Sequence, residues 1–134
     1  MLKSLSLKLG IELNVIWKGR IPAEDVPSYM SICDVVVDPV RNTLSNLARC
    51  PIKIIEAMYL GKPVVTSEVG DRKRILGEFG FYCKEGDSYS MAERIQEAIG
   101  STEFNKNKGL LINHALDYSW EKLAVKVEEL LQQL

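Results

Sequence analysis

The sequence is poor in the residues that bind metals and has no long apolar run. His114 is the only histidine, and the three cysteines, Cys33, Cys50 and Cys83, lie far apart without a Cys-x-x-Cys pair. This pattern argues against a zinc site and favours buried thiols in a reducing cytoplasm. His114 stands among apolar residues, which favours a packed or an exposed histidine over a catalytic base. No apolar run reaches the roughly 20 residues that span a bilayer, and no signal peptide is visible.

An excess of charge of either sign is also missing. The 134 residues include 17 Lys and Arg against 18 Asp and Glu, for a net charge of −1. Nothing in this balance predicts binding to nucleic acid or to an anionic membrane surface. Any phosphate site must therefore come from local geometry. The length fits a single domain, residues 1–134, and we find no internal repeat or linker.

The most informative stretch runs from Cys50 to Thr66 and predicts a short helix, a tight turn and a buried strand. Pro51 suits the first helical turn, where a missing N–H costs nothing. The helix face expected to pack inward comprises Ile52, Ile55 and Tyr59. Gly61 is placed to end the helix in the left-handed conformation. Val64 and Val65 follow as a β-branched pair typical of a parallel strand.

Lys53 and Glu56 are the two charged residues of this helix, and they share one face near its N-terminus. The N-terminus of a helix presents free N–H groups and a partial positive charge, which favours a phosphate. Lys53 would add a full charge there, and Glu56 could accept hydrogen bonds from a pair of hydroxyls. Spacing alone also allows an ordinary exposed ion pair between the two side chains.

Helical and extended patterns alternate along the rest of the chain. Helices are expected at 2–9, 24–33, 72–76, 91–99, 110–116 and 119–134, with a polar break at 101–108. Strands are expected at 14–17, 34–37, 64–66 and 79–83, of which 34–37 is expected to be central. The last helix has an apolar stripe, which we expect to pack on the sheet; a coiled-coil seam is the alternative.

This alternation predicts an α/β fold, a Rossmann-like parallel sheet with helices on both faces. Ligands of such sheets bind outside the carboxyl ends of the strands. Three loops follow predicted strands, namely 18–22, 38–49 and 67–71, and we expect them to converge on one edge as a site. The segment Gly77–Gly80 is not a dinucleotide fingerprint, because the strand–Gly-x-Gly-x-x-Gly–helix order is absent.

The run Pro51–Val65, Pro-Ile-Lys-Ile-Ile-Glu-Ala-Met-Tyr-Leu-Gly-Lys-Pro-Val-Val, resembles the donor-site signature of GT-B glycosyltransferases of family 4, or group 1. The resemblance extends from about Val15 to Leu131 and includes Tyr118-Ser119-Trp120-Glu121 at the start of the last helix. It implies part of a GT-B C-terminal domain that binds a nucleoside diphosphate sugar as donor substrate, without a further cofactor or a metal.

The resemblance also implies roles for single residues. Those that would line the nucleobase are Gly19, Arg20 and Ile21. Those that would approach the diphosphate are Arg49, Cys50, Pro51, Ile52 and Lys53. Glu56 would bind the ribose hydroxyls. No residue resembles a catalytic nucleophile.

The chain departs from the family pattern in three ways. Many members carry a second Glu eight positions before the ribose Glu, where this chain has Ala48. The turn after the Val-Val strand often contains Gly-Gly and then an acid, whereas this chain has Gly70-Asp71-Arg72-Lys73. A full member also has an N-terminal acceptor domain and opening strands that this chain does not match.

Two functional hypotheses follow from the resemblance. The first is the donor-binding part of a retaining glycosyltransferase that transfers a hexosyl unit, incomplete without an acceptor domain or a second chain. The second is a non-catalytic module that binds nucleotide or docks on a partner. A receiver-like or dehydrogenase-like sheet of unrelated function is a third possibility. We expect a cytoplasmic protein, with any membrane contact made through a partner.

Overall fold

The computed structural model describes residues 1–133 and contains a three-stranded parallel sheet in the order β1-β2-β3. The strands are β1 (Val36–Asp38), β2 (Val64–Ser67) and β3 (Gly80–Cys83). All four residues of β2 are buried, as expected for a strand with a neighbour on each side. The Rossmann-like α/β fold is confirmed, but β1 lies at an edge of the sheet and not at its centre.

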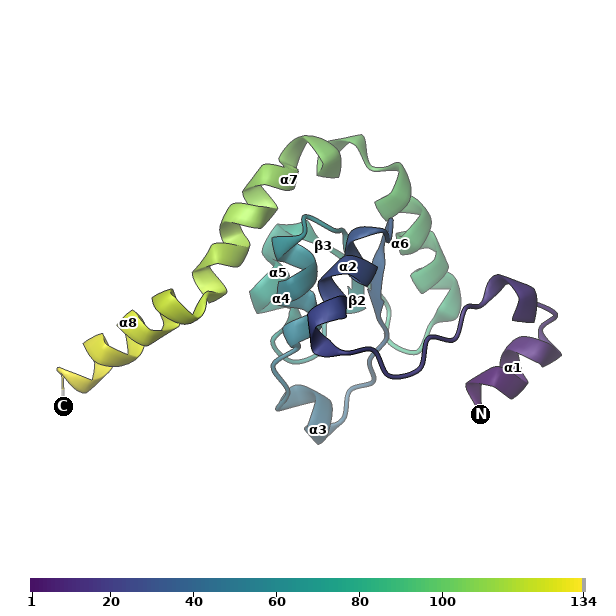
Figure 1. Ribbon diagram of the computed structural model, residues 1–134, viewed down its shortest axis with the longest axis horizontal. Coiled ribbons are helices and arrows are strands. Elements are labelled where there is room, and N and C mark those ends of the chain that lie inside the picture. Colours follow the sequence, from purple (N-terminus) through teal and green to yellow (C-terminus); the bar gives the residue numbers. More distant parts are fainter. Residues whose placement is uncertain (134) are drawn as a thin grey trace.

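Helices cover both faces of the sheet (Figure 1). Three helices share a core with Val64 on one face: α4 (Ile52–Tyr59), α5 (Arg72–Leu76) and α7 (Thr102–Ala115). The other face, at Val65, packs against α6 (Ser88–Gly100) through Ala98 and its apolar neighbours. Adjacent residues of a strand point to opposite faces, so this valine pair anchors both layers.

The helix α4 ends as predicted, but a different face is buried. Gly61 has φ +60°, its N–H donates to Met58 O, and the Lys62 N–H donates to Ala57 O, which together form a Schellman motif. The fully buried residues are Ile54, Ala57 and Met58. Of the predicted inward face, Ile55 and Tyr59 are partly buried and pack against the core, whereas Ile52 is 62% exposed. Apolar residues occupy most of this helix, so periodicity alone did not determine which stripe faces the sheet.

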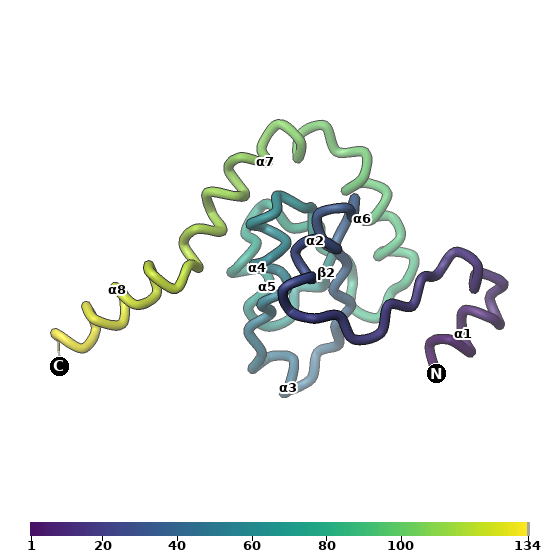
Figure 2. The backbone as a smooth tube through the Cα atoms, in the orientation of Figure 1, coloured from purple at the N-terminus to yellow at the C-terminus, as the bar shows by residue number. Residues whose placement is uncertain are grey.

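The N-terminal segment differs from the prediction. The helix α1 (Leu2–Lys8) forms and is followed by Gly10 at φ +65°, but the predicted strand 14–17 is absent. In its place stand the short 3-10 helix η1 (Glu12–Asn14) and irregular chain, with Ile16 79% exposed. A strand needs a hydrogen-bonded neighbour, and Figure 2 shows this segment leaving the body of the molecule.

The elements between the N-terminal segment and the sheet are short. The 3-10 helix η2 (Ala23–Asp25) leads into α2 (Val26–Ser31), close to the helix expected there. The loop after β1 is not entirely irregular, because it contains α3 (Leu44–Leu47), which Thr43 caps. The 3-10 helix η3 (Gly77–Phe79) precedes β3.

The C-terminal helices depart most from expectation. The helix α7 begins at Thr102, where the Ser101 hydroxyl accepts a hydrogen bond from the Phe104 N–H, so the predicted polar break is wrong. After η4 (Leu116–Tyr118), the helix α8 (Trp120–Leu131) has no buried residue and does not pack on the sheet (Figure 1). The predicted last helix also included Leu134, which lies outside the described residues.

Other side chains partly follow the predictions. His114 is packed, with Nε2 2.8 Å from Ile75 O and its ring beside Phe79 and Tyr118. Cys83 is buried as expected, whereas Cys33 and Cys50 are exposed. Among the helices that the structure describes, none combines the length and the apolar character needed to cross a membrane.

Candidate functional site

A cluster of three charged side chains lies at the carboxyl end of β1. Asp38 is the last residue of that strand and is buried. Its Oδ2 accepts a hydrogen bond from Arg72 Nε at 2.8 Å, and its Oδ1 lies 3.0 Å from Lys53 Nζ. The cluster carries two positive charges and one negative charge. The two cations neutralise the buried carboxylate and occupy both of its oxygens. The cluster keeps one net positive charge, which can attract an anion from solvent.

Arg72 fixes the loops around this cluster. It is 2% exposed although it begins a short helix with three basic residues. Its Nη1 donates to Val69 O at 3.0 Å and to Asn46 O at 3.5 Å. A single guanidinium therefore joins the end of β1, the loop after β2 and the end of α3.

Gly70 allows the same two loops to meet. It has φ +61°, and a Cβ at this position would lie 2.9 Å from Asn46 O and 3.1 Å from Leu47 O. Only glycine combines this conformation with so close an approach of two backbones. The predicted convergence of the loops 38–49 and 67–71 is therefore observed in the structure.

The third predicted loop does not join them. Gly19 has φ +67° with open space around it, Arg20 is exposed, and Ile21 is partly buried. Within residues 1–133, no side-chain hydrogen bond or ion pair connects these three residues to Asp38 or its partners. Lys18, next to them, lies 5.5 Å from the centre of the Tyr29 ring in α2. The structure gives these residues no place in the charged cluster.

The residues predicted to meet the diphosphate surround the start of α4. Pro51 is buried and precedes the helix as its N-cap residue, whereas Arg49 and Cys50 are exposed. Lys53 lies in the first turn with its side chain 48% exposed. The positive end of the helix dipole and an accessible ammonium together form a surface that favours an anion.

Glu56 lies one turn further along α4, and it does not pair with Lys53. Glu56 is partly buried, and its carboxylate has no hydrogen-bond or ion-pair partner in the described part of the chain. The exposed Lys53–Glu56 ion pair, the alternative that spacing allowed, is therefore wrong, because Lys53 pairs with Asp38. The free carboxylate oxygens of Glu56 can accept hydrogen bonds from hydroxyl groups.

A cavity of about 400 Å³ lies at the carboxyl ends of β2 and β3. Ser67 and Glu68 line it from one side, and Asn42 closes it from the loop after β1, where its N–H donates to Glu85 Oε1 at 2.6 Å. Tyr82, another lining residue, is partly buried, and this burial raises the pKa of its hydroxyl to about 12. Ligands of open α/β sheets bind outside this end of the strands.

Asp38 and Arg72 belong to the site but were not among the predicted site residues. Asp38 falls in the predicted loop 38–49, and Arg72 begins the predicted helix 72–76. An aspartate directly after a run of three valines does indicate a polar group at a strand end. Nothing in the sequence distinguishes Arg72 from Lys73 and Arg74, which are exposed.

Residues 1–133 contain no cluster of three or more His, Cys, Asp or Glu side chains suited to a metal ion.

Comparison with known proteins places this chain in a family. The family described as "Glycosyl transferases group 1" matches residues 1–114 of the chain. A curated protein of Bacillus subtilis (strain 168), "Putative teichuronic acid biosynthesis glycosyltransferase TuaH", is 32% identical over 111 residues. The alignment covers 82% of this chain and 28% of that protein. The chain thus spans a little over a quarter of the length of the relative that it matches.

Proposed function

Because the chain belongs to the group 1 glycosyl transferase family, we propose that it forms the donor-binding part of a retaining glycosyltransferase. Its substrate is a nucleoside diphosphate sugar, and the unit transferred is a hexosyl group. The acceptor is held by a further domain or by a second chain. Arg49, Cys50, Pro51, Ile52 and Lys53 surround the diphosphate, and Glu56 holds the ribose.

The position of Lys53 supports this proposal most directly. Asp38 holds its ammonium 3.0 Å from a carboxylate oxygen, in the first turn of α4. The other carboxylate oxygen of Asp38 is already occupied by Arg72. A diphosphate placed at the start of α4 meets the surplus positive charge of this cluster and the partial charge of the helix together.

The chemistry follows from the charge that develops on the leaving group. Transfer breaks the bond between the sugar carbon and the diphosphate oxygen, and the diphosphate departs with the bonding electron pair. The acceptor oxygen forms the new bond on the same face of the sugar, and its proton passes to the departing diphosphate oxygen. Lys53 and the positive end of the α4 dipole stabilise the added negative charge, a role that preorganised groups fulfil without a metal.

Binding measurements test this assignment. We would titrate the chain with UDP, GDP and ADP, and separately with the corresponding nucleosides, by isothermal calorimetry. Lys53→Ala is expected to weaken binding of the preferred diphosphate by about 1.5–3 kcal/mol, the range of a charged hydrogen bond, and to leave nucleoside binding unchanged. Glu56→Ala is expected to weaken diphosphate and nucleoside alike, by about 1–3 kcal/mol.

Lys126→Ala and Glu129→Ala on α8 are matched controls, because both residues are exposed on a helix without buried residues. They should bind nucleotide as the wild type does. If Lys53→Ala lost equal affinity for diphosphate and for nucleoside, the role of Lys53 would be contradicted. Unchanged affinity in Glu56→Ala would remove that residue from the site.

Ala48 favours a second candidate function, nucleotide binding without turnover. Its methyl group cannot bond to the hydroxyls of a transferred sugar, and α3 ends at this residue. A transfer assay with the labelled donor sugar, with and without a candidate acceptor-binding chain, separates the two functions. Nucleotide binding with no sugar transfer under any condition supports this second function over the first.

A further inference from the structure

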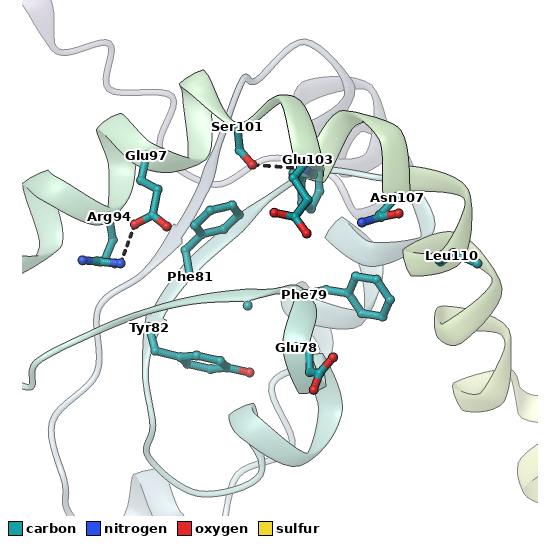
Figure 3. A pocket seen from close by; sticks show the side chains of 12 residues that line it. Glu78, Phe79, Phe81, Tyr82, Arg94, Glu97, Ser101, Glu103, Asn107 and Leu110 are labelled. Carbon is teal, nitrogen blue, oxygen red and sulfur yellow. Dashed lines mark hydrogen bonds and ion pairs between the residues drawn. The ribbon is translucent and has the colours of Figure 1, made fainter.

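A second cavity, of about 540 Å³, lies along β3 at the opposite edge of the sheet from the charged cluster. Gly80, Phe81 and Tyr82 of β3 line it directly. Figure 3 shows the ends of α6 and α7 on one side of the strand and the segment at Glu78 on the other. The cavity is therefore a groove that has a strand as its floor and two walls.

The strand at the floor of this groove has a free edge. β3 pairs with β2 on one side and is the last strand of the sheet within residues 1–133. An edge strand presents unpaired N–H and C=O groups, and these can pair with an added strand. Its side chains are held in place: Phe81 packs on Phe104 with ring centres 5.9 Å apart, and the Tyr82 hydroxyl donates to Gly77 O at 2.6 Å.

The walls of the groove are acidic. Glu97 on α6 pairs with Arg94, which is also in the lining. Glu78 and Glu103 line the groove from opposite walls, and neither has an ion-pair partner among the residues that the structure describes. The three carboxylates and one guanidinium leave a net charge of −2 around a free strand edge.

We propose that this groove binds an extended basic peptide segment, which adds to β3 as a fourth strand. Main-chain hydrogen bonds to the strand edge supply affinity in this binding mode, and the walls select the alternating side chains. Lysine or arginine side chains on either side of the added strand would reach Glu78 or Glu103. A second copy of the chain is a poor occupant, because pairing two β3 edges brings the same acidic walls together.

Peptide binding tests the proposal directly. The probe is a fluorescein-labelled peptide of about six residues, the usual strand length, in which Lys alternates with Val. We expect saturable binding to the full 134-residue chain in a fluorescence anisotropy titration. The amide resonances of Gly80–Tyr82 should shift in parallel. The same peptide with Glu in place of Lys should not bind.

Two further comparisons distinguish strand addition from charge attraction alone. Glu78→Gln combined with Glu103→Gln should weaken the Lys-Val peptide by about tenfold or more, whereas Glu128→Gln combined with Glu129→Gln on α8 should not. N-methylation of one alternating set of peptide nitrogens should abolish binding, and methylation of the other set should be tolerated, because only one set faces β3.

Any of three results would overturn the proposal: equal affinity in the two double variants, equal tolerance of both methylation patterns, or amide shifts confined to other segments. Concentration-dependent dimerisation that shifts Gly80–Tyr82 without peptide would also overturn it, in favour of a second copy. Circular dichroism of the variants checks that the exposed glutamates were replaced without loss of the fold. Nucleotide binding does not enter this test, so its outcome is independent of the proposed function.

Discussion

The buried pair of Asp38 and Arg72 gives a sharp test of how the site is held together. Asp38→Leu leaves the Arg72 guanidinium buried without its counter-ion, which costs about 3–5 kcal/mol when one partner of a buried pair is removed. That is a large share of the roughly 5–15 kcal/mol by which a domain is stable. Arg72→Met should cost less, because Asp38 keeps Lys53 at 3.0 Å.

The double variant Asp38→Leu with Arg72→Met removes both charges together. It should be only about 1–3 kcal/mol less stable than wild type, mainly because the Val69 carbonyl loses its buried donor. The two single losses should therefore exceed the double loss, with a coupling energy of about 2–3 kcal/mol. Lys53→Met is the control, since an exposed partner should contribute no more than about 1 kcal/mol.

Urea denaturation followed by circular dichroism measures these differences, provided that the slopes of the four chains agree. The result that refutes the reasoning is simple additivity of the two single variants. Additivity would mean that each residue stabilises the fold independently and that the 2.8 Å contact between Arg72 Nε and Asp38 Oδ2 contributes nothing.

Three other variants or conditions test the fold around the site. Gly70→Ala should lower the free energy of unfolding by more than the roughly 1–2 kcal/mol expected for left-handed strain alone, because its Cβ meets the Asn46 carbonyl. Gly10→Ala, with φ +65° and open space around it, is the matched control. Urea denaturation measures both variants. Tyr82 holds its proton to about pH 12 in the folded chain, whereas a free tyrosine loses it near pH 10. The unfolded chain therefore binds fewer protons in that range, so stability should fall as pH rises from about 10 to 12, and less so in Tyr82→Phe. Asp87→Ala should destabilise the fold by about 1 kcal/mol, the usual loss for an N-cap, since its Oδ1 accepts hydrogen bonds from the N–H groups at 89 and 90; thermal unfolding followed by circular dichroism checks this.

The sequence predicted correctly where helices begin or end when a single residue decides it. Gly61 was expected to end a helix and does so with φ +60°. The last helix was expected to begin at Ser119, whose hydroxyl caps α8 by accepting a hydrogen bond from the Lys122 N–H. These features depend on neighbours within one helical turn, so the sequence contains all that decides them.

Errors arose where the outcome depends on distant partners. Residues 14–17 have the composition of a strand, but the structure offers them no neighbouring strand. The polar run 101–108 was expected to be irregular, yet Phe104 anchors it in the core and Ser101 caps it as a helix. Arg72 is buried because it contacts Asp38 and the Asn46 carbonyl, which are 34 and 26 residues away in the sequence. Contacts between residues so far apart in the sequence leave no local pattern from which they could be predicted.

The same ion pair connects stability to the proposed function. Replacing a buried pair by apolar residues is often nearly neutral, so stability alone does not explain why Arg72 and Asp38 occur together. Asp38 contacts Lys53, and Arg72 contacts Asp38, so under the proposed function the pair prearranges the ammonium for a diphosphate.

The Asp38→Leu/Arg72→Met variant separates prearrangement from net charge, because it removes one charge of each sign. If the proposed function is correct, Lys53 must then be ordered when the ligand binds, at a cost of about 0.5–1.5 kcal/mol, or roughly twofold to tenfold in the affinity for UDP or the preferred diphosphate. The dependence of that affinity on salt concentration should stay the same, since the net charge is unchanged. A variant that folds and binds the diphosphate as tightly as wild type would show that Asp38 and Arg72 serve the fold alone.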